Sequence, residues 1–430
     1  MYLNVPEVYS YTFCLACLVN FLVSSVVMLK NNCRDTLVKF EFFFLIAFFF
    51  TNIVYSVVYY PVFPYFFLFN LPFNENYINK GLTLSILAVN VFNIGIYDKS
   101  RPQINKLNFI HTRYKEPRIL VYLLMCLYLP ILIVAVQANS YVVGFTKSNV
   151  NAILVFVFYY ILYAVFANNN ENKVYSIKSF LKESHSLLLF SIIGLYIVLF
   201  LSIGSRTIPL RLILIIFLLY VIYVRNIKNN YVLGLLLCGA ILMMAVSVFR
   251  ARGDFNTENF TSVWDVGMDL TINNRSLYVL MEEADLHGVT WGKSLLSSIA
   301  AMIPWGQSLL LDITGWKISD INSANFVTEL YFSNLKYDTE KYGLGTNMIG
   351  DVYYAFGMPG VLVYMFLLGN ILKKLYRGIC RGNHIYVYFY AMIFIEVIYI
   401  TRANSLEFLR NIVWGMIWFY IFNRLMPVKR

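Results

Sequence analysis

Residues 186–203 read SLLLFSIIGLYIVLFLSI, a run of 18 residues without a charged side chain. A helix needs roughly 20 predominantly apolar residues to cross the hydrocarbon core of a bilayer. The run therefore predicts a membrane-spanning helix. It sets the expected fold class because similar runs recur along the whole chain.

These runs together predict about eleven membrane-spanning helices. The expected spans are 9–29, 40–60, 81–97, 119–137, 149–167, 186–203, 212–224, 231–249, 347–369, 385–401 and 411–423. The composition agrees, since 59% of the residues are hydrophobic and only 13% are charged, against roughly a quarter charged in a soluble domain. The segment 212–224 is short and can form a hairpin with its neighbour, so counts of ten or twelve stay open. We expect an all-α polytopic membrane protein.

Lys and Arg residues divide unevenly between the two alternating sets of connecting segments. The set that begins with 30–39 and ends with the C-terminal tail holds 21 of the 34 Lys and Arg residues. The alternate short segments hold 6, and the long segment 250–345 holds 7. Because cytoplasmic loops are enriched in Lys and Arg, the first set and the C-terminus are predicted to be cytoplasmic. The N-terminus and 250–345 then face the outer side, and no Lys or Arg is left in a span.

This distribution also explains the net charge of +11. The basic residues follow the topology and form no patch, so we expect no nucleic-acid partner. The chain then divides into an N-terminal bundle of about eight spans (1–249), one large outer loop (250–345) and a C-terminal bundle of about three spans (346–430).

The outer loop contains an apolar stretch of its own, which continues from Gly292 to Ile303 and is too short to span a bilayer. We expect it to form a re-entrant or interfacial helix over the bundle. Trp291 and Trp305 would then lie at the headgroup boundary, where tryptophan is enriched.

Arginines are unexpectedly frequent on the predicted outer side. They are Arg250 and Arg252 at the opening of the long loop, Arg275 within it, Arg206 and Arg211 around Pro209, and Arg402 and Arg410 in the last outer loop. A guanidinium group binds phosphate oxygens through two parallel hydrogen bonds. For any single arginine, the simpler explanation is that its side chain extends to the phosphates of the lipid headgroups. The pair that opens the long loop and the pair that brackets the last outer loop, taken together, favour a bound ligand.

A glycine-rich segment, YGLGTNMIGDVYYAFGMPG at 342–360, leads from the long loop into a span. Its five glycines permit close backbone approach and close helix packing. Asp351 lies about one turn inside the predicted helix. A carboxylate at that depth is costly and usually functional, although a helix N-terminus also favours it electrostatically. Glu396, the acid of the tenth predicted span, is expected to pair with a polar group inside the bundle.

A second acidic cluster precedes the apolar stretch of the long loop. It consists of Glu282, Glu283 and Asp285, followed by His287. Any of these side chains can act as a general base toward a hydroxyl, and a solvated charged helix explains them equally well. The four histidines are scattered along the chain, so no metal site is predicted.

These features, in this order, resemble the Wzy-type O-antigen and oligosaccharide repeat-unit polymerases. Members typically have arginines at the opening of a large periplasmic loop, then Gly-Lys/Arg-Ser-Leu running to Ile-Pro, then Gly-Leu-Gly-x-x-x-Ile-Gly-Glu-x-Tyr-x-x-Phe-Gly-x-x-Gly. Here the matching positions are Arg250 and Arg252, Gly292 to Pro304, and Gly343 to Gly360. Asp351 stands where the family usually has Glu, so its carboxylate reaches one methylene less far.

The resemblance implies a GT-C-like glycosyltransferase of the bacterial inner membrane, with a periplasmic N-terminus. It would polymerise repeat units carried on undecaprenyl pyrophosphate at the periplasmic face, without a metal or cofactor. The expected ligands of this donor are Arg250, Arg275, Lys293, Asn347, Arg402 and Arg410. Arg252 would stabilise the leaving pyrophosphate, and Asp351 or Glu282 would deprotonate the acceptor hydroxyl. Membrane lipids are further partners, and whether a chain-length regulator binds stays open.

Two other functions remain as alternatives. An O-antigen ligase would transfer the finished polymer to a lipid core. A flippase or transporter should place charged or polar residues along a path through many spans, whereas this chain has no basic residue in any predicted span and a long outer loop instead.

Overall fold

The computed structural model describes residues 5–33, 36–62, 73–98, 114, 116–137, 149–168, 180, 186–202, 205–225, 227–239, 271–333 and 343–425. Every regular element within these ranges is a helix. The expected all-α fold is therefore confirmed for the described part of the chain. Arg250 and Arg252 lie outside the described residues.

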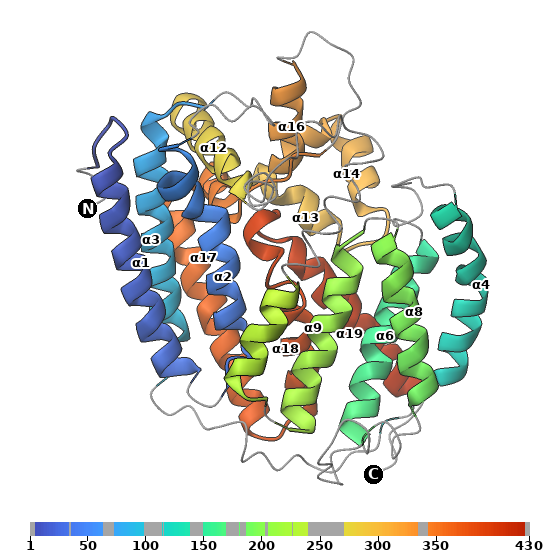
Figure 1. Ribbon diagram of the computed structural model, residues 1–430. Coiled ribbons are helices and arrows are strands. Elements are labelled where there is room, and N and C mark those ends of the chain that lie inside the picture. The colour runs from blue at the N-terminus through green and yellow to red at the C-terminus, as the bar shows by residue number, and fades with distance from the viewer. Residues whose placement is uncertain are drawn as a thin grey trace.

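One group of long helices is built around α17 (Met348–Cys380). Beside it lie α1 (Tyr11–Asn32), α2 (Phe40–Asn52) with its continuation η2 (Tyr55–Tyr59), and α3 (Asn76–Ile96). α17 packs most extensively against α3, and α3 packs against α1 (Figure 1).

Glycines bring α3 and α17 into backbone contact. A Cβ on Gly369 would lie 2.7 Å from the carbonyl oxygen of Phe92, and a Cβ on Gly95 would lie 2.6 Å from the carbonyl oxygen of Phe366. Small residues are typical of helix interfaces in membranes, because they let two backbones approach closely. The α3–α17 contact therefore depends on these two positions.

The second group of helices contains α4 (Arg118–Gln137), α6 (Asn149–Asn168), α8 (Leu187–Ser202) and α9 (Thr207–Tyr223). Two C-terminal helices join it to the first group. α18 (His384–Phe394) packs against α17 and α9, and α19 (Glu407–Leu425) packs against α18 and α6.

A cap of shorter helices covers one end of the bundle. It consists of α12 (Asn273–His287), η7 (Lys293–Leu295), α13 (Leu296–Ala300), α14 (Gly306–Thr314), α15 (Ile318–Ile321) and α16 (Ser323–Ser333). α1 begins at the capped end (Figure 1). The apolar stretch from Gly292 to Ile303 forms a short helical segment, in which η7 continues directly into α13, followed by a turn, and its interfacial position stays a prediction.

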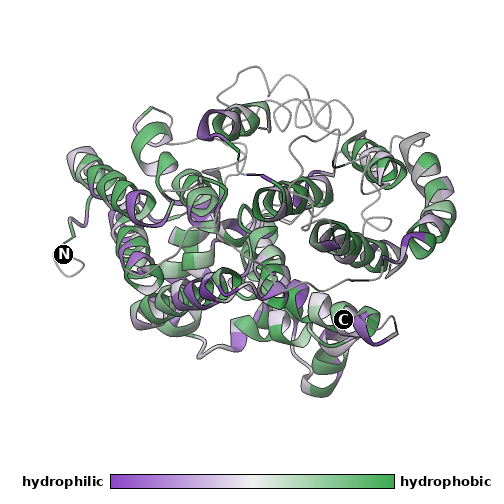
Figure 2. Ribbon diagram, turned by 90° about the horizontal axis from the view of Figure 1, so that it is seen from below, coloured by the Kyte–Doolittle hydropathy of each residue, from purple (hydrophilic) through white to green (hydrophobic). Residues whose placement is uncertain are grey.

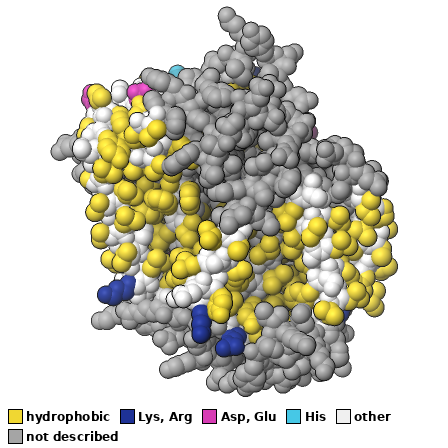
Figure 3. Space-filling view, viewed as in Figure 1, with side chains coloured by type: hydrophobic (Ala, Val, Ile, Leu, Met, Phe, Trp, Pro, Cys, Tyr) yellow, Lys and Arg dark blue, Asp and Glu magenta, His cyan; other side chains and the backbone are white. Residues whose placement is uncertain are grey.

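The outer surface of the bundle is apolar. Val19, Val23 and Val26 of α1 are exposed, and end-on the helices are hydrophobic over much of their circumference (Figure 2). On the face shown in Figure 3, hydrophobic side chains form a broad belt, with Lys and Arg near the end opposite the cap and acidic side chains near the capped end. Large exposed apolar areas of this kind mark contact with a membrane or a partner.

Length and composition alone identify fewer spans than expected. Within the described residues, α1 and α17 are long and apolar enough to cross a bilayer, and six further apolar helices are 10 to 17 residues long. The total of about eleven spans stays a prediction. The expected span 385–401 is not one helix, because α18 ends at Phe394 and turns follow.

Candidate functional site

The candidate site lies between the cap and the bundle, where the connection from α18 to α19 meets the start of α9. After α18, the chain forms tight turns and the short 3₁₀ helix η8 (Ile400–Arg402) before α19 begins at Glu407. Turns of this kind expose backbone and polar groups within an otherwise apolar region, so they require fixed hydrogen-bond partners.

Asp351 supplies those partners from the first turn of α17. Its carboxylate oxygen Oδ2 accepts hydrogen bonds from the backbone N–H and the hydroxyl of Ser405, both at 2.7 Å. The hydroxyl of Tyr364 donates to the carbonyl oxygen of Ser405, also at 2.7 Å. Asp351 is fully buried. Its position indicates that it holds the α18–α19 connection in place.

Asn347 fixes the start of α17 in the same region. Its side-chain oxygen caps the helix by accepting from the backbone N–H groups of Ile349 and Gly350, which is a favourable role for asparagine. Its amide nitrogen donates to Asn52 Oδ1 at 2.9 Å. Asn347 is therefore occupied by protein partners on both sides of its amide.

A pocket of about 170 Å³ opens beside this connection. It is lined by Thr207, Arg211, Glu396, Tyr399, Ile400, Ala403, Asn404, Glu407 and Phe408. Six of the nine lining residues have polar or charged side chains, although the surrounding helices are apolar. Arg211 and Glu396 thus place two costly buried charges beside one small space.

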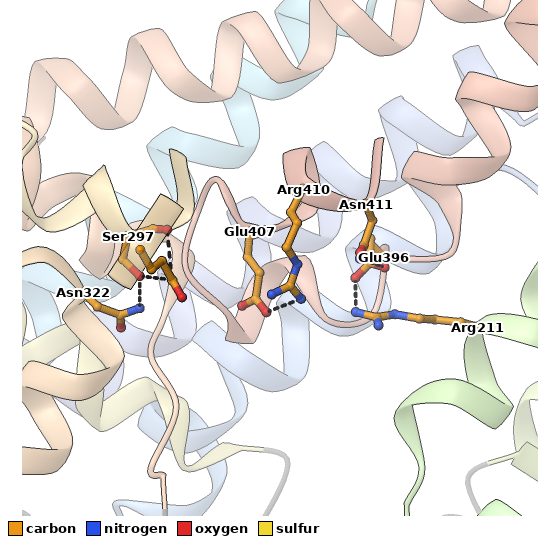
Figure 4. A network of polar contacts seen from close by, with 8 residues as sticks. Arg211, Ser297, Asn322, Glu396, Glu407, Arg410 and Asn411 are labelled. Carbon is orange, nitrogen blue, oxygen red and sulfur yellow. Dashed lines mark hydrogen bonds and ion pairs between the residues drawn. The ribbon is translucent and has the colours of Figure 1, made fainter. Parts of the chain in front are cut away.

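An ion pair between α9 and the α18–α19 connection forms one wall of the pocket (Figure 4). A terminal guanidinium nitrogen of Arg211 lies 2.6 Å from Glu396 Oε2, and Asn411 Nδ2 donates to Glu396 Oε1 at 2.7 Å. The Arg211 and Glu396 side chains are 16% and 4% exposed. Removing one partner of such a pair costs about 3–5 kcal/mol, because the other charge stays buried.

Not every nitrogen of Arg211 is hydrogen-bonded within the protein. Its buried Nε atom has no hydrogen-bond partner among the described residues. The expectation that Arg211 lies in a loop, with all basic residues outside the helices, is wrong, because Arg211 lies within α9. The expectation that Glu396 pairs with a polar group is confirmed.

Two further arginines flank the pocket. Arg410 lies one turn after Glu407 in α19, and one of its terminal guanidinium nitrogens is 3.5 Å from Glu407 Oε1. Both side chains are about 40% exposed, so this ion pair contributes little to stability. Arg402 is half-buried and directly precedes two lining residues. Its guanidinium makes no hydrogen bond or ion pair to any residue that the structure describes, while its carbonyl accepts from Asn273 Nδ2 at 3.3 Å. Two of the arginines thus pair with the two glutamates of the lining, Arg211 with Glu396 and Arg410 with Glu407.

The other predicted ligands lie elsewhere. Arg275 is buried in α12, where its guanidinium donates to the Tyr55 hydroxyl at 3.3 Å. Lys293 Nζ lies 4.5 Å from the centre of the Trp316 ring and 3.6 Å from Asp320 Oδ2. Glu282 is half-buried on α12 and does not line the pocket.

Several lining residues escaped the reasoning from sequence. Glu407 and Tyr399 are ordinary polar residues near the ends of apolar segments, and no motif marks them. The available signal was the isolated charge of Arg211 and of Glu396, since two opposite charges in apolar helices at the same predicted membrane face are expected to pair.

Comparison with known families adds to this geometry. The family model described as O-antigen polysaccharide polymerase Wzy matches residues 1–426, nearly the whole chain, and confirms the resemblance seen in the motifs. No curated protein and no solved structure matches. Wzy proteins are membrane proteins that act on lipid-linked oligosaccharide repeat units. The chain belongs to the O-antigen polysaccharide polymerase Wzy family.

Proposed function

We propose that this protein polymerises oligosaccharide repeat units carried on undecaprenyl pyrophosphate, at the periplasmic face of the bacterial inner membrane. The observation that carries the proposal is the pocket between α9 and the α18–α19 connection, which Arg211 lines, with Arg402 next to the lining residue Ala403 and Arg410 paired with the lining residue Glu407. Family membership supplies the class of reaction, and the pocket supplies a place for it.

The arginines suit a pyrophosphate group in particular. Charge-assisted hydrogen bonds from guanidinium to phosphate oxygens are short and specific. Arg402 is not engaged by any described side chain, and Arg410 has only a weak, exposed partner. Arg250 and Arg252, which lie outside the described residues, are further candidates for the same ligand because they match the family motif.

In the proposed reaction, a hydroxyl of the non-reducing-end sugar on one repeat unit attacks the anomeric carbon of the growing chain. The new C–O bond forms as the bond from that carbon to the pyrophosphate oxygen breaks. The electron pair leaves on undecaprenyl pyrophosphate, and the hydroxyl proton passes to a base. The arginines stabilise the charge that develops on the leaving group, so no metal ion is required.

The cap supports this placement at a membrane surface. Trp305, which precedes the first residue of α14, and Leu309 and Ile313 within α14 are all exposed. Such exposed apolar residues suit a helix that lies in the headgroup region. We propose that the cap, as part of the loop 250–345, is periplasmic and rests on the outer leaflet.

The purified protein in proteoliposomes tests this proposal. Supplied with synthetic undecaprenyl-pyrophosphate repeat units and excess EDTA, it should produce a ladder of lipid-linked oligomers and free undecaprenyl pyrophosphate. Transfer only to a lipid core would indicate a ligase. Movement of the unit across the bilayer without new glycosidic bonds would indicate a flippase, and strict dependence on a divalent ion would contradict the metal-independent mechanism.

A further inference from the structure

We infer that Glu407 is the general base that takes the proton from the acceptor hydroxyl, an inference that rests on the proposed polymerase function. Glu407 is the first residue of α19 and lines the pocket together with Arg211 and Glu396. Its side chain is 40% exposed, and its closest ionic partner, Arg410, is 3.5 Å away.

The other acids near the pocket are less accessible to a substrate. Glu396 is the only other acid in the described pocket lining, and its two oxygens are bound to Arg211 and Asn411 at 2.6 and 2.7 Å. Asp351 is fully buried behind the α18–α19 connection, where it holds Ser405. Glu407 is thus the one carboxylate of the lining that can both reach a substrate and accept its proton.

The surroundings of Glu407 differ on its two sides (Figure 4). On one side lie Arg211 and its partners. On the other, the neutral residues of the cap form a hydrogen-bonded group in which Asn322 Nδ2 donates to Ser297 Oγ at 3.0 Å. The side-chain nitrogen of Gln307 donates to the same oxygen at 2.7 Å, and the helix that carries Ser297 packs against α19.

This arrangement separates donor from acceptor. A cationic side suits the pyrophosphate of the donor, and a side of amides and hydroxyls suits the hydroxyls of a sugar. A base must lie within hydrogen-bond reach of the hydroxyl that it deprotonates, and Glu407 lies at the boundary between the two. One Glu407 oxygen takes the hydroxyl proton as the new C–O bond forms, and undecaprenyl pyrophosphate leaves toward the arginines with the electron pair.

The test compares Glu407→Gln with Glu407→Asp in proteoliposomes, with Glu329→Gln as a matched control. Glu329 is an exposed acid of α16 in the same cap and does not line the pocket. Glu407→Gln should lower polymer turnover by about 10²–10⁴-fold, the usual contribution of a general base. The affinity of this variant for undecaprenyl pyrophosphate should be at least that of the wild type. Glu407→Asp should retain part of the turnover, and Glu329→Gln should retain all of it.

The pH dependence of turnover supplies a second readout. The decline of activity toward acidic pH should be present in the wild type and absent from the residual activity of Glu407→Gln. The inference fails if Glu407→Gln polymerises at the wild-type rate, or if undecaprenyl pyrophosphate binding is lost together with turnover. If the wild type makes no polymer at all, the proposed function fails as well, so the two failures are distinguishable.

Discussion

Arg211 and Glu396 are separated by 185 positions in the sequence, yet their side chains meet at 2.6 Å in the wall of the pocket. This contact ties α9 to the α18–α19 connection and fixes the orientation of a guanidinium that still has a free Nε–H. We therefore expect the pair to have two separable roles, in stability and, through the guanidinium that lines the pocket, in ligand binding.

Replacement of one or both partners separates these roles. Glu396→Gln should destabilise the protein by about 3–5 kcal/mol, because Arg211 keeps its charge in a buried position. The double variant Arg211→Met with Glu396→Met should recover most of the lost thermal stability in detergent, yet form no polymer. A double variant that restores both stability and polymer would show that Arg211 has a structural role alone.

Arg402, in contrast, is expected to affect ligand binding without affecting stability. Because its guanidinium makes no hydrogen bond or ion pair within the described residues, Arg402→Ala should leave the unfolding temperature unchanged. Loss of one charge-assisted interaction is worth about 1.5–3 kcal/mol, so the KM for the lipid-linked donor should rise about 10- to 100-fold. Arg402→Lys should restore only part of the affinity for the donor, since lysine lacks the planar guanidinium group that binds two phosphate oxygens at once. Normal polymer ladders from both variants would remove Arg402 from the site.

Asp351 is expected to act through Ser405. Asp351→Asn and Ser405→Ala should each lower stability by about 1–3 kcal/mol, since each weakens a buried hydrogen bond, and their thermal unfolding curves should shift by similar amounts. Polymer turnover per folded molecule should fall far less than in Glu407→Gln. A loss of 10²-fold or more in Asp351→Asn, with unchanged stability, would instead make Asp351 the base.

The α3–α17 interface predicts a steric effect. A methyl group on Gly369 would lie 2.7 Å from the Phe92 carbonyl oxygen, so Gly369→Ala must push two helices apart. Overpacking typically costs about 1–3 kcal/mol, and the unfolding temperature measured by circular dichroism should fall. Gly194→Ala in α8 is the matched control, because nothing lies within 4 Å of its added Cβ. Equal unfolding temperatures for the two variants would contradict this packing.

Hydropathy located the long helices well because an uncharged run of about 20 residues has few other stable conformations near lipid. The predicted spans 9–29 and 186–203 correspond closely to α1 and α8. The predicted span 385–401 is wrong as a single helix. The mean hydropathy of these residues is high, and it does not reveal that the chain turns after Phe394 and places Glu396 beside Arg211.

The site was foreseeable only in part. Arg402 and Arg410 attract attention because cations are disfavoured in short outer loops, and both lie beside the pocket. The contribution of Glu407 was hidden, because its surroundings come from α9, α13 and α19, which are distant in sequence. Pairings of that kind depend on tertiary structure, and residue type or spacing does not reveal them.

The most direct measurement is the binding of undecaprenyl pyrophosphate to the protein in lipid nanodiscs, compared with undecaprenyl monophosphate and with the double variant Arg402→Ala, Arg410→Ala. The wild type should bind the pyrophosphate more tightly than the monophosphate, and the double variant should lose that preference while it stays folded. Equal affinity of the wild type for both lipids, or an undiminished preference in the folded double variant, would contradict a pyrophosphate site between α9 and the α18–α19 connection.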